Sequence, residues 1–461
     1  MREPAPIDPT TLSAEALAQH YRSGALSPLE AARAVLGRIA RLNPQLNAVI
    51  ALDGEGALAA AARSEARWRA DRPLGPLDGV PLTVKDNIPV AGLPCRWGSP
   101  AWPGTIPARD ELPVARLRAA GAVILGKTNV PEFTLEGYTD NTLFGPTRNP
   151  WNTRLTPGGS SGGAVAAVAA GLGPLAVGTD GGGSIRRPAS HTGLVGLKPT
   201  PGRAPRADGL PAILLDLEVI GPIARTVGDA ALLLEAMGGP AARGPSFPAP
   251  RLRIRYVPRF GASPVDPGIA AAVAAAAGRL AALGHRVEEG PPPFDPEAIL
   301  PLFPAIASAG LAWLLGSLPG NPSPASPALR AMAGAGRSMP AAALFAALDG
   351  MAAFRLSMAR FLSTDCDAIL TPSAAALPWP ATESHPPEIG GQPAGPRGHA
   401  VFTNFANLGA LPGIALPCDP VAGMPAGFQL VGAPGAEGTL LAVAREYEAA
   451  HPWAQRWPEL P

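Results

Sequence analysis

The sequence Thr156-Pro-Gly-Gly-Ser-Ser-Gly-Gly163 is followed, after an apolar segment, by Gly178-Thr-Asp-Gly-Gly-Gly-Ser-Ile-Arg186. Both stretches are glycine-rich loops that carry serines. Serine reacts as a nucleophile only when a base lies beside it and N–H groups face the developing oxyanion. Glycine lets the chain present such N–H groups with no side chain in the way. Two such loops within about thirty residues therefore predict one active site, with the rest of the chain as its scaffold.

Helix and strand signals alternate around these loops. A short apolar strand over 79–84 leads directly to Lys85, and a strand over 174–177 leads into the second serine loop. A helix of small residues over 163–170 lies between the two loops. This alternation predicts the α/β class with strands buried on both faces. Residues 290–345 lack strand signals and are rich in proline, glycine and alanine, so we expect a helical insertion there.

Composition excludes several classes of protein. The chain has 461 residues, of which 47% are hydrophobic, and a net charge of +1, so a basic surface for nucleic acid is not expected. The three cysteines are far apart and the histidines show no metal-ligand spacing, so we expect a reduced, cytoplasmic protein without a metal site. The longest apolar run, 164–177, is short for a bilayer and contains two glycines and a proline, and the first residues lack a signal-peptide core.

The first loop admits more than one interpretation. Gly158-Gly-Ser160-Ser-Gly162 matches the G-x-S-x-G pattern of an α/β-hydrolase esterase, in which Ser160 would be the nucleophile. The five histidines that follow it have no context typical of a catalytic histidine. A phosphate-binding loop is excluded, because neither serine loop has a lysine after its last glycine.

Lys85 offers a different base. It stands at the end of an apolar strand, where loss of hydration disfavours the ammonium form. A neutral lysine can activate a serine. Taken alone, Lys85 is better explained as a structural lysine at a strand end, paired with Asp86, so a catalytic interpretation depends on what accompanies it.

The combination of Lys85, the first serine loop and Ser184 after three glycines resembles the amidase signature family. The resemblance continues through the stretches 193–200, 221–227, 229–234, 370–372, 402–409, 411–412 and 427–430. It implies a single α/β/α domain over residues 1–461, with a mixed central sheet flanked by helices. The family pattern is clearest over 75–235 and 365–450, and a variable helical insertion is expected over about 240–365.

The resemblance also implies roles for individual residues. Lys85 matches the family's general base, Ser160 the bridging serine that usually follows a cis peptide bond, and Ser184 the nucleophile. It therefore reverses the esterase interpretation, since Ser160 becomes a proton relay. The oxyanion is expected to be held by backbone N–H groups of Gly181, Gly182, Gly183 and Ser184, and support is expected from Ser161, Asp180 and Arg186. Ser161 either assists the relay or only caps the following helix. Family members often have a bulkier residue where Gly181 stands, which predicts a looser loop.

The resemblance implies a free-standing hydrolase of the aryl acylamidase or urethanase type, with no cofactor, acting on small aryl or alkyl amides and on related carbamates and esters. We expect a monomer or homodimer, without nucleic-acid or membrane partners. The residues expected to contact substrate are Tyr138, Phe144, Phe303, Trp313 and Trp379. The alternative is the glutaminase subunit of a tRNA-dependent amidotransferase. Such subunits usually carry Arg-Tyr-Gly where this chain reads Arg206-Ala-Asp-Gly209.

Overall fold

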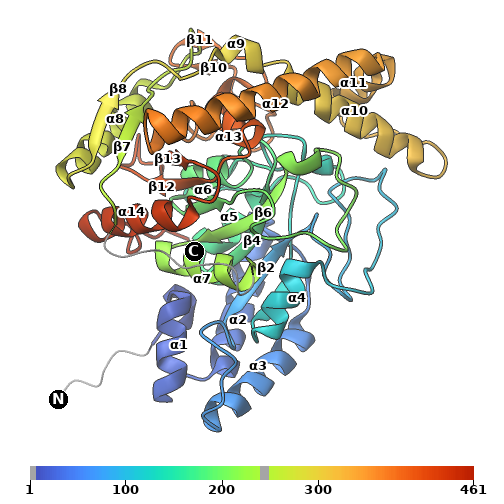
Figure 1. The fold of residues 1–461 in the computed structure, drawn as a ribbon. Coiled ribbons are helices and arrows are strands. Elements are labelled where there is room, and N and C mark those ends of the chain that lie inside the picture. The colour runs from blue at the N-terminus through green and yellow to red at the C-terminus, as the bar shows by residue number, and fades with distance from the viewer. Residues whose placement is uncertain (1–6, 239–248, 461) are drawn as a thin grey trace.

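The computed structural model describes residues 7–238 and 249–460 (Figure 1). One sheet of eleven strands runs through them in the order β1-β3-β2-β4-β6-β5-β12-β13-β9-β7-β8. The strands are β1 (Val49–Leu52), β2 (Pro81–Lys85), β3 (Val123–Thr128), β4 (Leu175–Asp180), β5 (Val195–Lys198), β6 (Val219–Ala224), β7 (Arg253–Tyr256), β8 (Arg286–Glu289), β9 (Ala368–Pro372), β12 (Gly413–Pro417) and β13 (Gly427–Gly432). β10 (Glu388–Ile389) and β11 (Gln392–Pro393) form a separate hairpin.

The sheet is mixed. β2 runs parallel to β3 and β4, and β7 runs parallel to β8 and β9, whereas β6, β5, β12 and β13 are antiparallel to their neighbours. The predicted α/β class with a mixed central sheet is therefore confirmed.

Helices cover both faces of the sheet. They are α1 (Ala14–Ser23), α2 (Pro28–Leu46), α3 (Gly54–Arg69), α4 (Leu112–Ala119), α5 (Gly162–Ala169), α6 (Arg186–Thr192), α7 (Val227–Gly238), α8 (Pro267–Ala282), α9 (Pro296–Ile299), α10 (Leu302–Ser317), α11 (Pro327–Ser338), α12 (Ala341–Thr364), α13 (Asn404–Leu408) and α14 (Glu437–Ala450), with short 3₁₀ helices η1 (Pro9–Thr11), η2 (Glu132–Thr134), η3 (Leu215–Leu217) and η4 (Gly398–Ala400). Local sequence explains several of these ends. Ser27 and Glu30 form a capping box at the start of α2, with Pro28 at the first helical position.

Successive residues of the central strands point to opposite layers. In β4, Leu175 and Val177 join the large core that includes residues of α7 and α14, whereas Ala176 packs into a smaller core with α5. This period of two is what a strand buried on both faces requires. Figure 1 shows α10, α11 and α12 together at one end of the molecule and α1, α2 and α3 at the other.

The strand order explains where the site forms. β2 and β4 are parallel neighbours, so their carboxyl ends meet at one edge of the sheet. β2 ends at Lys85, β4 ends at Asp180, and α5 begins directly after Ser161. The fold therefore brings the lysine and both serine loops to the same edge.

Some elements differ from the sequence-based expectations. Residues 290–345 are helical as predicted, but β1, β5, β6 and α6 were not expected. β6 contains Gly221-Pro222, a pair typical of a turn, yet Pro222 lies opposite Val177 within the sheet. Tertiary pairing with β4 overrides the local signal there.

Among the described residues, two helical stretches have the length and composition of a membrane span, Pro296–Ser317 and α12. They are 44% and 22% buried, respectively. Core helices of soluble proteins pass the same test, so this is weak evidence for a span.

Candidate active site

Lys85 lies at the centre of the site and is fully buried. Its Nζ lies 2.8 Å from Ser160 Oγ, 2.8 Å from Thr179 Oγ1 and 3.1 Å from the Thr179 carbonyl oxygen. A neutral amine has two N–H donors and one lone pair. In the ammonium form Lys85 donates to all three oxygens. In the neutral form donation to the two Thr179 oxygens leaves the lone pair for the hydroxyl proton of Ser160, so the same partners satisfy the uncharged form.

Electrostatics favours the uncharged form. Burial is the largest effect on the pKa of Lys85 and lowers it. The charges of Glu218 and Asp180 raise the pKa, those of Arg206 and Arg187 lower it, and the resulting pKa is about 7. At this pKa a substantial fraction of Lys85 is neutral at physiological pH. A buried lysine at a strand end is thereby available as a base.

A carboxylate network surrounds the lysine on one side. Thr179 Oγ1 donates to Glu218 Oε2 at 3.3 Å, and Asn87 Nδ2 donates to Thr179 Oγ1 at 3.1 Å. Glu218 in turn accepts from Arg206 at 2.8 Å, and Arg206 also pairs with the buried Glu111 at 2.6 Å. This network fixes Thr179 and sets the charge near Lys85.

The two serine loops are tied to each other. The Ser161 N–H donates to the Ser184 carbonyl at 3.1 Å, and Ser161 Oγ donates to the Thr179 carbonyl at 3.1 Å. Ser161 precedes α5 but makes no side-chain capping bond, so it acts on the loop rather than on the helix end. The peptide bond Gly159–Ser160 is cis, as the family resemblance implied. Ser160 is fully buried, whereas Ser184 retains 7% exposure, which suits the serine that meets a substrate.

Asp180 organises the second loop from inside. Its carboxylate accepts from the N–H groups of Gly183 at 2.7 Å and Ile185 at 3.1 Å. It also forms a fully buried ion pair with Arg186 at 3.0 Å and accepts from Asn407 Nδ2 at 3.0 Å. Burial opposes its charge, but Arg186 and Asn407 more than offset this and hold the pKa of Asp180 far below its usual range.

The Gly183 contact corrects one expectation. Because its N–H is bound by Asp180, Gly183 does not fit the predicted role of oxyanion donor. Within the described chain, the N–H groups of Gly181, Gly182 and Ser184 make no hydrogen bond. These three remain as candidate donors. Gly183 is required for shape instead: its φ is +110°, and a Cβ would lie 2.1 Å from Thr403 Oγ1.

The remaining glycines of the loop are covered by apolar side chains. A Cβ on Gly181 would lie 2.6 Å from Leu214 Cδ1, so Leu214 fills the space that a side chain at this position would need. Gly182 faces the Phe303 ring, with Cε2 at 3.4 Å from an added Cβ. Arg187 and Thr403 both donate to the Gly182 carbonyl. The loop predicted to be loose is thus packed and tethered.

Phe303 is the expected substrate residue that lies against the oxyanion loop. Trp313, also on α10, is 58% exposed, and no contact joins it to either serine loop among the described residues. Phe144 is partly buried, and its carbonyl accepts from Asn47 at 2.7 Å, away from both serines.

Tyr138 and Trp379 flank the first loop. A Cβ on Gly159 would lie 2.4 Å from the Tyr138 carbonyl oxygen, so this backbone packs directly against the residue before Ser160. The Tyr138 side chain is partly buried, and burial raises its pKa to about 12. Trp379 is buried, and its ring contacts His191 and His399, which makes it part of the core behind the loop.

Sequence reasoning left several supporting residues unassigned. Thr179, Asn407 and Gln429 lie inside motifs that carry the family resemblance. Their place in these motifs indicated that they lie near the site, but it did not indicate what each residue does there. Gln429 accepts from Arg186 at 2.8 Å. Glu218 and Arg206 had no comparable signal, because only the fold brings them to Lys85.

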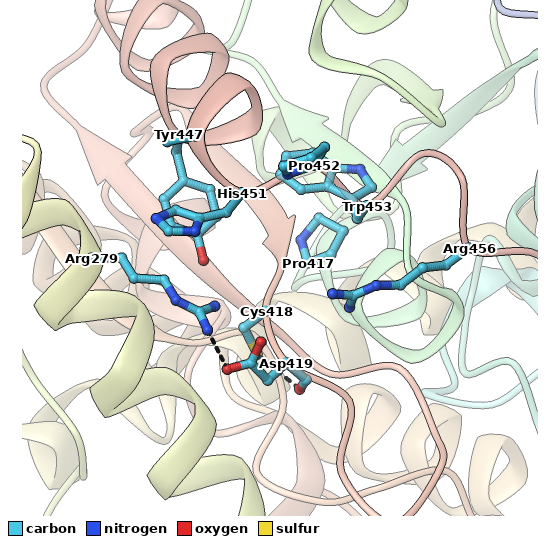
Figure 2. A pocket seen from close by; sticks show the side chains of 10 residues that line it. Arg279, Pro417, Cys418, Asp419, Tyr447, His451, Pro452, Trp453 and Arg456 are labelled. Atoms are coloured by element: carbon cyan, nitrogen blue, oxygen red, sulfur yellow. Dashed lines mark hydrogen bonds and ion pairs between the residues drawn. The ribbon is translucent and has the colours of Figure 1, made fainter.

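A cavity of about 250 Å³ opens elsewhere, near the end of β12 (Figure 2). It is lined by Arg279, Pro417, Cys418, Asp419, Tyr447, Ala450, His451, Pro452, Trp453 and Arg456. None of these residues contacts Lys85, Ser160 or Ser184, so this cavity is separate from the candidate active site. Over residues 7–238 and 249–460, no group of three or more His, Cys, Asp or Glu side chains is arranged to hold a metal ion.

Comparison with known proteins gives consistent matches. Residues 30–441 match the family model described as Amidase. The glutamyl-tRNA(Gln) amidotransferase subunits A of Roseiflexus sp. (strain RS-1) and Roseiflexus castenholzii are 36% and 38% identical to this chain, over 95% of it and 96% and 95% of their own lengths. A bacterial aryl acylamidase of the amidase signature family superposes with a TM-score of 0.87 at 28% identity, covering 96% of this chain and 97% of its own.

Proposed function

Because this chain belongs to the amidase signature family of C–N hydrolases, we propose that it cleaves amides through an acyl-enzyme formed on Ser184. One observation supports the proposal above all: the buried Lys85 Nζ lies 2.8 Å from Ser160 Oγ, in the loop that is bonded to Ser184. These contacts support the proposed order of a base, a relay and an accessible serine.

The first half of the reaction forms the acyl-enzyme. Neutral Lys85 takes the hydroxyl proton of Ser160 as Ser160 Oγ takes that of Ser184. The Ser184 Oγ–carbon bond forms, and the carbonyl oxygen becomes an oxyanion that the N–H groups of Gly181, Gly182 and Ser184 stabilise. One such donor typically contributes about 3–4 kcal/mol.

The second half releases the products. The C–N bond breaks as the leaving amine takes a proton from Ser160, which Lys85 reprotonates. Water then attacks the acyl-enzyme, with its proton passed to Lys85 by the same relay, and Ser184 leaves with a proton. Each group returns to its starting state without a cofactor.

Our first candidate substrates are small aryl or alkyl amides, with carbamates and esters as related carbonyl compounds. Leu214 and Phe303 support this choice, since both place apolar surface beside the oxyanion loop. An apolar group next to the scissile carbonyl would pack there. We expect such an enzyme to act in the cytoplasm without a second protein, as monomer or homodimer.

The second candidate is a glutaminase that passes ammonia to a partner subunit. Sequence comparison favours it more than the first, because the amidotransferase subunits match over nearly the whole chain. Against it, the Arg-Tyr-Gly element is replaced by Arg206-Ala-Asp, and Arg206 is engaged with Glu111 and Glu218. The two candidates share one mechanism and differ in substrate and partner.

A hydrolysis panel separates them. The purified chain is assayed alone against anilides, alkyl amides, aryl carbamates, esters and glutamine. Turnover of anilides without a partner supports the free-standing enzyme, whereas glutaminase activity that appears only with partner subunits and tRNA supports the second candidate. A fluorophosphonate reagent should label Ser184, and labelling of Ser160 instead would overturn the assigned roles.

A further inference from the structure

Two segments that are distant in sequence meet above the oxyanion loop. Arg397 lies between β11 and η4, and Phe303 lies in the first turn of α10. The Arg397 guanidinium carbon lies 5.4 Å from the centre of the Phe303 ring, and that ring covers Gly182. Arg397 is therefore one aromatic ring away from the backbone expected to hold the oxyanion.

The guanidinium is largely unused by the protein. It donates one hydrogen bond, to the Leu135 carbonyl at 2.9 Å, out of five N–H groups available to arginine. Across the described residues it forms no ion pair, in contrast to Arg186 and Arg206. The side chain is exposed, yet burial lowers its pKa. Both statements hold for a guanidinium that has many protein atoms around it and still meets solvent.

The charged groups around Arg397 leave its surroundings positive. Arg187 lies close enough for the two charges to interact. Burial and, after it, the charge of Arg397 lower the pKa of Arg187, to about 9 in total. His399 is buried and its pKa lies well below the usual value, so it adds no charge at neutral pH. Glu136 is the acid that acts on Arg397, but it makes no ion pair or hydrogen bond within the described residues. Glu136 therefore reduces the positive potential around Arg397 but leaves the remaining guanidinium N–H groups free to bind a ligand.

We propose that Arg397 binds a carboxylate of the substrate, so that the enzyme prefers amides that carry a carboxylate separated from the scissile bond by an apolar segment. Guanidinium groups bind carboxylates through two parallel hydrogen bonds, and Phe303 provides the apolar surface between the two ends. The carboxylate belongs either to the acyl part or to the amine part. This inference rests on the proposed amide hydrolysis at Ser184 and names its substrate class.

The test compares pairs of substrates that differ only in the carboxylate. Glutaryl and pentanoyl para-nitroanilide form the acyl-side pair, and butanoyl para-aminobenzoate and butanoyl para-toluidide form the amine-side pair. The wild type should show the higher kcat/KM for the carboxylate member of one pair. Arg397→Gln should lower that value by about 10- to 100-fold and change the neutral member much less. Arg360→Gln, an exposed arginine on α12, is the matched control and should change neither.

Glu136→Gln sharpens the test in the opposite direction, because loss of its charge should increase the preference for the carboxylate. Binding of the same pairs to Ser184→Ala, measured by calorimetry, needs no turnover and should show the same dependence on Arg397. Equal kcat/KM within both pairs, or an equal loss on charged and neutral members in Arg397→Gln, would overturn the proposal while leaving amide hydrolysis intact. Absence of all turnover would contradict the proposed function, and calorimetry would then decide the role of Arg397 by itself.

Discussion

The floor of the site and its rim are built differently. The floor, defined as Lys85, Ser160, Thr179, Asp180 and Arg186, is fully buried and densely hydrogen-bonded. The rim, defined as Glu136, Phe303 and Arg397, has a guanidinium with one hydrogen bond and a carboxylate with none in the described chain. A polar group whose hydrogen bonds are all made within the protein can keep its neighbours in position, but it has few donors or acceptors free for a ligand. The floor is therefore suited to the reaction and the rim to the choice of substrate.

The largest effect should follow from loss of the reacting groups, which are the nucleophile Ser184 and the floor residues Ser160 and Lys85. Ser184→Ala, Ser160→Ala and Lys85→Ala should each reduce kcat by at least about 10³-fold, and the double variants should lose little more, because the three residues act as a unit. Single-turnover assays on any substrate of the panel measure this.

A substitution outside both the floor and the rim serves as the control for these variants. Trp313 is 58% exposed on α10, so Trp313→Ala should leave kcat within about twofold of the wild type. Near-full activity in Lys85→Ala would show that the base lies elsewhere and would remove the distinction between floor and rim.

A smaller effect is expected on the free energy of unfolding. Loss of the buried ion pair of the floor should lower it more than loss of an exposed ion pair. Asp180→Asn leaves the fully buried Arg186 charge without its carboxylate and should cost about 3–5 kcal/mol in the free energy of unfolding. Asp216→Asn breaks the pair of Asp216 with Arg355 at 2.8 Å, in which Asp216 is 48% exposed, and should cost less than about 1 kcal/mol. Denaturant unfolding compares the two variants, and equal costs would contradict the interpretation of Asp180 as an internal organiser.

The sequence predicted the floor better than the rim for physical reasons. Apolar periodicity identified most strands, and the spacing of Lys85, Ser160 and Ser184 identified the family pattern. The contact of Lys85 with Thr179 requires β2 and β4 to be neighbours, which local patterns do not encode. Likewise, the N–H of Gly183 was expected to face the oxyanion, but three-dimensional folding turns it toward Asp180.

At the rim the sequence indicated which kinds of residue could contact substrate, but not which residues they would lie against in the fold. Phe303 and Trp313 were both expected to contact substrate. Phe303 lies against the oxyanion loop, whereas Trp313 is exposed to solvent. Both are aromatic residues on one apolar helix, so composition alone does not separate them. Arg397 was not singled out, because its significance depends on stacking over a ring from another segment.

The smallest predicted effect is on the pH dependence of kcat/KM, which the protonation state of Lys85 should control. Lys85 must be neutral to accept a proton, so kcat/KM should rise with pH along a limb centred near its pKa of about 7. The charge of Glu218 raises this pKa, and Glu218→Gln removes that charge and leaves Arg206 less neutralised. Both changes disfavour the ammonium form, so the limb should move to lower pH by roughly one unit. Glu136→Gln at the rim, which does not act on Lys85, should leave the limb in place. A limb that stays fixed in Glu218→Gln, or moves to higher pH, would mean that Lys85 is not the group that titrates.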